Sequence, residues 1–242
     1  MTFDVHHYAK AYYSNIQPAP GNLYPRLKAW EFLYEYIWDD SRTSWSDLTS
    51  KTQLETTALH IGFYLANWGM FRGSSGLLQN SNLDLMKALA KLLFEGQGAK
   101  LLELSLEDFG PDNPHRAQHQ KLLDSVLGSM ESLATNVSWT NTLKTKILMG
   151  VWGECPALDR FYIAACRDLF PRRSSITNAS GKGLAALAEL VEELAVPPLP
   201  LETGRLGLQY PTARIMDMAM FQYGLELEQG FDNQAAAAVQ GR

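Results

Sequence analysis

Apolar side chains recur along most of the chain at spacings of three and four residues, and convincing strand-like alternation is absent. One such face is formed by Trp30, Leu33, Tyr34 and Ile37. Ser46 is placed to cap the segment that follows. The pattern predicts an all-α fold with helices over about 24–39, 46–70, 82–95, 100–108, 114–130, 141–151, 156–170, 184–195 and 213–228.

The chain has 242 residues, enough to bury a sizeable core in one domain. We therefore expect a single helical domain over residues 1–242. The alternative division has two lobes that flank a cleft. One lobe would contain residues 1–110 with the C-terminal helices, and the other would be a core of residues 111–175.

Cysteine usage and hydropathy indicate a soluble, cytoplasmic protein, which we expect to be a monomer. There are 2 cysteines, without the spacing of a metal site or a disulfide framework. The start, MTFDVHHYAKAYY, lacks the pattern of a signal peptide. No run approaches the ~18 apolar residues that cross a membrane. His115 and His119 lie four apart without an acidic or thiol partner nearby, so we expect no metal.

Charge is unevenly distributed. The net charge is −5, which argues against a protein that coats nucleic acid regardless of sequence. Residues 140–175, however, include six basic residues and only three acidic ones. A local basic patch can bind phosphate on an acidic protein. The residues predicted to contact a phosphate backbone are Lys144, Lys146, Arg160, Arg172 and Arg173.

The stretch from Gly153 to Tyr162 reads as the end of one helix, a short link and the start of the next. Pro156 suits the first turn of the new helix, and Asp159 falls in that turn, where the helix dipole favours a carboxylate by roughly 0.3–1 kcal/mol. An ionised aspartate in a cleft can stabilise an oxocarbenium-like sugar and position water. The alternative interpretation is an ordinary aspartate at a helix start.

The segment ILMGVWGECPALDRFYIAACRDLF (147–170) resembles the catalytic segment of the helix-hairpin-helix DNA glycosylase superfamily. Gly153, Pro156, Asp159, Phe161 and Arg167 occupy matching places. The resemblance implies an all-α protein that flips a base out of double-stranded DNA and cleaves its N-glycosidic bond, with Asp159 as the catalytic residue. The target would be a damaged base, or a modified base in a defence against viral DNA.

Three departures from the family refine this expectation. The preceding residues, VSWTNTLKTKI, lack the glycine-rich hairpin, and the iron–sulfur cysteine cluster is absent. Neither Lys144 nor Lys146 stands at the spacing of the family's lysine nucleophile. The resemblance therefore implies a monofunctional glycosylase that uses water and needs no cofactor.

A second stretch, residues 64–76, combines glycines, serines, aromatic residues and an arginine at the end of an apolar helix. Glycines allow close approach of a ligand, and aromatic rings can stack on a base while an arginine binds phosphate or a base edge. The predicted substrate-binding residues are Tyr64, Asn67, Trp68, Phe71, Arg72 and Ser74. The alternative is a buried aromatic turn whose arginine satisfies carbonyl groups.

A third stretch, residues 209–217, could line a cleft through Thr212 and Arg214. The interpretation we favour is a capped helix in which Asp217 pairs with an arginine.

Two other functions remain open for the chain as a whole. It could be a non-catalytic helical module that binds a protein or small ligand near Trp68. It could also be a nucleoside or nucleotide N-glycosyl hydrolase that needs no duplex DNA.

Overall fold

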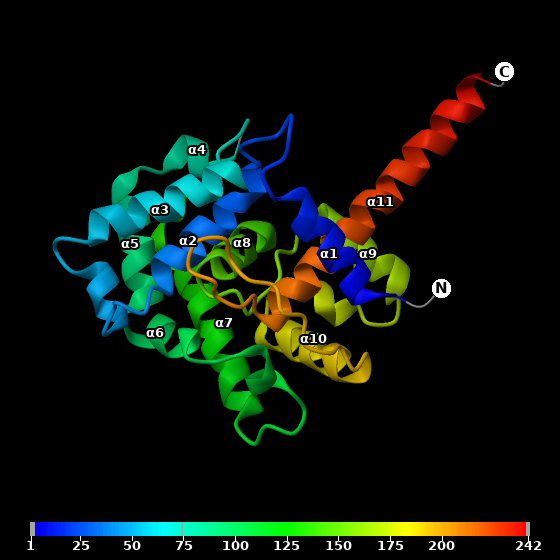
Figure 1. Ribbon diagram of the computed structural model, residues 1–242. Helices are drawn as coiled ribbons and strands as arrows, with labels where there is room; N and C mark the ends of the chain where they lie inside the picture. Colours follow the sequence, from blue (N-terminus) through cyan, green and yellow to red (C-terminus); the bar gives the residue numbers. More distant parts are fainter. Residues whose placement is uncertain (1–2, 74, 241–242) are drawn as a thin grey trace.

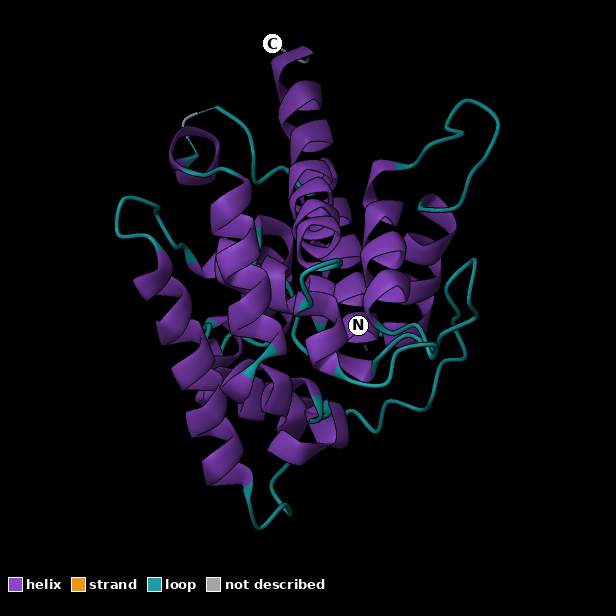
Figure 2. Ribbon diagram, turned by 90° about the vertical axis from the view of Figure 1, so that its left-hand side faces the viewer, coloured by secondary structure: helices purple, strands orange, loops and turns teal. Residues whose placement is uncertain are grey.

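The computed structural model describes residues 3–73 and 75–240, with the backbone alone for 231–240. In that part of the chain there are eleven α-helices and no β-strand, which confirms the all-α class (Figures 1 and 2). None of these helices is both long and apolar enough to span a membrane. The helices are α1 (Val5–Asn15), α2 (Ala29–Ile37), α3 (Leu54–Asn67), α4 (Gly76–Asn80), α5 (Leu83–Phe94), α6 (Gly96–Leu102), α7 (Arg116–Leu133), α8 (Asn141–Val151), α9 (Arg160–Leu169), α10 (Gly181–Glu193) and α11 (Thr212–Gln240).

Helix α8 runs through the middle of the molecule (Figure 1), and every residue from 143 to 151 is buried. Side chains of α2 and α3 hold it by hydrogen bonds to its carbonyl groups. The Trp30 indole N–H donates to the Met149 carbonyl at 2.8 Å, and the Tyr64 hydroxyl donates to the Lys146 carbonyl at 2.8 Å. The bond to Met149 satisfies one of the last carbonyls of α8, which lack partners within the helix.

The approach of α3 to α8 depends on a glycine. A Cβ atom at Gly150 would lie 2.5 Å from a ring carbon of Tyr64 and 3.0 Å from a methyl carbon of Leu33. Both contacts are tighter than side chains tolerate in a packed interior. Gly150 thus sets the distance at which α2 and α3 pack on the central helix.

Helix α11 packs against α1 and α9 through its first turns, and its C-terminal half extends away from the rest of the molecule (Figure 1). Its crossing with α9 is close, since a Cβ atom at Gly224 would lie 2.1 Å from the carbonyl oxygen of Phe161. Buried apolar residues from Val5 to Met220 form one continuous cluster, so the two ends of the chain share a core.

Several boundaries differ from the sequence prediction. Helix α9 begins at Arg160 rather than near Pro156, because residue 159 has an extended backbone and caps the helix. Ser44, not Ser46, caps the 3-10 helix Trp45–Thr49. The short helix α4 and the N-terminal helix α1 were not predicted. Helix α1 buries Val5, Ala9 and Tyr12, a spacing that carries its helical signal.

Candidate functional site

Asp159 is the N-cap of α9, one residue before the first turn in which the sequence had placed it. Its Oδ1 accepts hydrogen bonds from the backbone N–H groups of Phe161 and Tyr162, both at 3.1 Å. Its Oδ2 has no hydrogen-bond partner among the described residues, and the side chain is half-buried. One carboxylate oxygen therefore maintains the helix start, and the other is available for a ligand.

The link that presents Asp159 is fixed at both ends. Gly153 has a φ of +77°, which ends α8 in the left-handed conformation that glycine adopts without strain. Thr145 of α8 accepts the Leu158 N–H at 3.0 Å, and Asp217 of α11 accepts the Ala157 N–H at 2.8 Å. The position of residue 159 is thus set by two helices that pack against the link.

Lys146 lies near Asp159. Its buried Nζ donates a hydrogen bond of 3.0 Å to the carbonyl of Trp68 and lies 5.6 Å from the centre of the Trp68 indole ring. Burial lowers the pKa of Lys146, and the charge of Asp159 opposes that shift. Burial likewise raises the pKa of Asp159, and the charge of Lys146 is the largest influence that opposes it. Each group therefore favours the ionised form of the other.

A second charged pair lies beneath this site. Arg214 is fully buried, pairs with Asp217 and donates to the Tyr12 hydroxyl at 3.1 Å. Its guanidinium lies 5.3 Å from the centre of the Trp68 ring. Burial raises the pKa of Asp217 to about 6, although Arg214 opposes the shift. The favoured interpretation of the third stretch, an Asp217 paired with an arginine, is confirmed.

Two buried N–H groups in this cluster find no hydrogen-bond acceptor among the residues that the structure describes. They are the Nε1 of Trp68 and the Nε of Arg214. An unpaired buried donor costs free energy, and such groups in native proteins call for an explanation. Together with the free Oδ2 of Asp159, they give the region around Trp68 unused hydrogen-bonding capacity.

The structure separates the predicted substrate-binding residues. Trp68 lies in the cluster just described, but it is 3% exposed, so its prediction as a ring that stacks on a base does not fit this structure. Tyr64 is 1% exposed and its hydroxyl is bonded within the core, so its prediction as a substrate contact does not fit this structure. Asn67 bonds the Phe63 carbonyl through its side chain. Phe71 lines an apolar groove beside α3 and α5.

Arg72 is exposed, folds back over Gly69 and lies close enough to lower the pKa of Lys146. It therefore stands at the edge of the cluster. Ser74 lies outside the described residues.

The predicted row of DNA-backbone contacts does not form. Lys144 and Lys146 are both buried, because α8 is surrounded on all sides, and Lys144 pairs with Glu131 at 2.5 Å. Arg160 pairs with Glu228 at 3.5 Å and Arg173 pairs with Glu193. Among the five, Arg172 alone is exposed without an ion-pair partner in the described chain.

A cation that the sequence reading missed lies nearer to the site. Arg26 directly follows Pro25, is exposed, and donates a hydrogen bond to the carbonyl of Asn67, the last residue of α3. Like Arg72, it lowers the pKa of Lys146. These two arginines, rather than those of residues 140–175, bring positive charge to the edge of the Trp68 region. The sequence carries no signal for this contact, which joins segments 41 residues apart.

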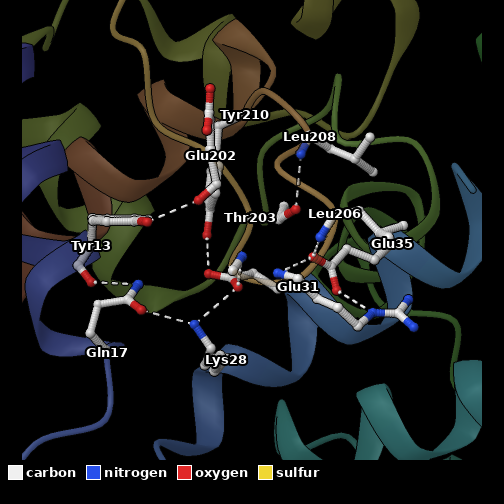
Figure 3. A network of polar contacts seen from close by, with 12 residues as sticks. Tyr13, Gln17, Lys28, Glu31, Glu35, Glu202, Thr203, Leu206, Leu208 and Tyr210 are labelled. Carbon is white, nitrogen blue, oxygen red and sulfur yellow. Dashed lines mark hydrogen bonds and ion pairs between the residues drawn. The ribbon is translucent and has the colours of Figure 1, made fainter.

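Two buried carboxylates on α2 were also missed (Figure 3). Glu31 accepts from the Tyr210 hydroxyl at 2.8 Å and the Gly204 N–H at 2.8 Å, and forms an ion pair of 3.0 Å with Lys28. Glu35 accepts from the backbone N–H groups of Arg205 and Leu206, both at 2.7 Å. With these donors the two side chains act as a clamp on the loop before α11, and we assign them a structural role.

Comparison of the chain with protein-family models, with curated proteins and with solved structures returned no match. The function is therefore argued from the geometry of the site.

Proposed function

We propose that this protein is a DNA glycosylase that hydrolyses the N-glycosidic bond of a damaged or modified base, with Asp159 as the catalytic carboxylate. The observation that carries the proposal is the free Oδ2 of Asp159, held by a rigid link near Lys146, whose ammonium group lies over the indole of Trp68. The resemblance of residues 147–170 to the helix-hairpin-helix glycosylases supports the same role.

In the proposed reaction the target nucleotide leaves the duplex at a cost of a few kcal/mol, which is least for a damaged or mispaired base. The C1′–N bond breaks and its electron pair departs with the base, which takes up a proton. The negative charge of Asp159 stabilises the oxocarbenium-like sugar. A water oxygen then bonds to C1′ and releases its proton, leaving an abasic site.

Lys146 acts in this proposal as a fixed cation rather than as a nucleophile. Its hydrogen bond to the Trp68 carbonyl and its position over the indole ring both favour the protonated form. In its protonated form the amine cannot attack the sugar, so in this proposal water is the nucleophile and no strand cleavage is expected. Its charge favours the ionised form of Asp159, which the reaction requires.

The first test is Asp159→Asn. Asparagine caps a helix about as well as aspartate, so the fold and thermal unfolding should be nearly unchanged. Activity should fall by about 10²- to 10⁴-fold, since the charge is lost. The measurement is the formation of alkali-labile sites in duplexes that carry uracil, hypoxanthine, 8-oxoguanine, alkylated adenine or hydroxymethylated cytosine.

The matched control is Asp168→Asn, which alters an exposed carboxylate on the same helix and should leave activity intact. Wild-type protein that leaves no alkali-labile site in any modified duplex would contradict the proposal. Borohydride should trap no covalent DNA complex. A trapped complex that disappears in Lys146→Met would instead assign a lyase mechanism.

A second candidate is a nucleoside or nucleotide N-glycosyl hydrolase with the same carboxylate. The pairing of Lys144, Arg160 and Arg173 with glutamates favours it, because a smaller substrate needs fewer phosphate contacts. Release of free base from nucleosides, measured against release from duplex DNA, separates the two candidates.

A further inference from the structure

The loop between α1 and α2 projects from the body of the molecule (Figure 1), and two adjacent apolar side chains on it, Leu23 and Tyr24, are exposed. Tyr24 is 90% exposed and Leu23 is 63% exposed, the highest values among the large apolar residues of the described chain. Two adjacent apolar side chains held in water are costly, and such features mark interaction sites more often than scattered single residues do.

Backbone hydrogen bonds and buried residues order the loop on both sides of Leu23 and Tyr24. Ala19 and Asn22 exchange two backbone hydrogen bonds, of 3.1 and 2.9 Å, across a turn that contains Gly21 at a φ of +88°. Ile16 and Pro25 are buried at the two ends of the loop. Leu23 and Tyr24 lie between this turn and the buried Pro25, so the backbone that carries them is held on both sides, and little backbone entropy is lost when they bind.

The loop also has the charge and position to meet DNA. From residue 16 to residue 30 there is no acidic side chain, and Arg26 is basic, whereas the charge of Lys28 is paired with Glu31. Arg26 anchors the base of the loop to the carbonyl of Asn67, at the end of α3 that leads into Trp68. Only one guanidinium nitrogen makes this bond, which leaves further N–H donors for a phosphate.

We propose that Tyr24, with Leu23 beside it, inserts into the base stack of the DNA and fills the space left by the flipped nucleotide, while Arg26 binds an adjacent phosphate. This inference rests on the proposed function. An apolar side chain that enters between bases compensates for the stacking lost when a nucleotide turns out. The exposed ring of Tyr24 could enter the stack, and the neighbouring Arg26 could bind the phosphate.

The test uses the full chain with Asp159→Asn and a duplex that contains a tetrahydrofuran abasic analogue beside 2-aminopurine. We expect this protein to bind the analogue duplex more tightly than an intact duplex and to change the 2-aminopurine fluorescence. Tyr24→Ala should weaken binding to the analogue duplex by about 5- to 150-fold and abolish the fluorescence change. Tyr24→Phe should retain both.

Leu59→Ala is the control, because it removes another exposed apolar side chain from α3, which lines a separate groove. Equal binding by Tyr24→Ala and its parent would overturn the inference. A second result would also overturn the inference. If Tyr24→Ala lost association with phosphatidylglycerol vesicles while its DNA binding was unchanged, Tyr24 would be a lipid contact.

This readout is separate from catalysis. A protein that forms abasic sites but shows no dependence on Tyr24 would retain the proposed function and refute only this inference. A protein that forms none, yet binds the analogue duplex through Tyr24, would refute only the glycosylase proposal.

Discussion

Lys146 and Asp159 are 13 positions apart in the sequence, yet each contributes to the ionisation of the other. The lysine comes from a helix that is buried on every side, and the aspartate comes from the first position after a rigid link. A buried charge is tolerated when a partner of opposite sign and hydrogen bonds compensate for its lost hydration. Here the two groups and the Trp68 carbonyl provide that compensation.

The pair gives a prediction for the pH dependence of activity. Asp159 must be ionised, and burial raises its pKa, so the rate should fall as the pH drops through that raised value. The charge of Lys146 lowers this pKa. In Lys146→Met the pKa of Asp159 should rise, and the acid limb of the pH–rate profile should move to higher pH.

Lys144→Met is the control for this experiment, because Lys144 lies on the same helix but pairs with Glu131. Its profile should keep the wild-type acid limb. An identical shift in both variants would show that general loss of positive charge, rather than the proximity of Lys146, controls Asp159.

At the scale of single residues, the sequence indicated Asp159 correctly as a carboxylate at a helix start but misplaced it by one position. Cap and first-turn residues share composition, and only backbone dihedral angles separate them. The sequence could not reveal the environment of Lys146, because a lysine on a helix is normally solvated. The burial of its ammonium follows from contacts with residues about 80 positions away.

At the scale of elements, α8 organises the site because it contributes Lys146 and contacts both α2 and α3. The two ends of this helix, Asn141 and Val151, were predicted closely from the sequence. Its central place was not, since a helix with lysines at positions 144 and 146 reads as amphipathic rather than fully buried. Tyr64 was predicted to bind substrate because aromatic content in a sequence does not distinguish a pocket from the core.

The packing of α8 can be tested through its glycine. Gly150→Ala should lower the free energy of unfolding by about 1–3 kcal/mol, because the added methyl group overlaps the ring of Tyr64. Urea unfolding followed by circular dichroism measures the change.

A glycine in open space provides the contrast. Gly128 lies in the exposed face of α7, and a Cβ there would meet no atom within 4 Å. Gly128→Ala should raise the free energy of unfolding by up to about 1 kcal/mol through helix propensity alone. If Gly150→Ala and Gly128→Ala changed the free energy of unfolding in the same direction, the close approach at Gly150 would not be the cause of the change.

At the scale of the whole molecule, the N-terminal and C-terminal parts are joined through Glu31 and Glu35. These carboxylates take hydrogen bonds from residues about 170 positions later in the chain. The residues on α2 read in sequence as ordinary helix-surface charges. Nothing in a local pattern tells a solvated glutamate from one that receives backbone N–H groups from a distant loop.

Glu35→Ala should therefore destabilise the fold by about 2–4 kcal/mol at neutral pH, because the Arg205 and Leu206 N–H groups lose their acceptor. Burial raises the pKa of Glu35, but the hydrogen bonds from Leu206, Thr203 and Arg205 outweigh it, so the net pKa is lowered. This stabilisation is present at neutral pH and is lost as the pH falls through the lowered pKa.

The difference between Glu35→Ala and wild type, measured by urea unfolding, should thus shrink in acid. Glu55→Ala removes an exposed glutamate whose ion pair with Lys87 spans 3.5 Å, and should change stability by about 0.5 kcal/mol or less. A similar cost for the two variants would refute the clamp.

The start of α9 can be capped by aspartate, asparagine, serine or threonine with similar stability. Selection for folding alone would leave position 159 free to drift among these four residues, of which only aspartate brings a negative charge. A single exchange of Asp159 for one of the three uncharged caps would then give a protein that keeps the same fold and performs no hydrolysis. The proposed reaction depends on an oxygen atom that the architecture can do without.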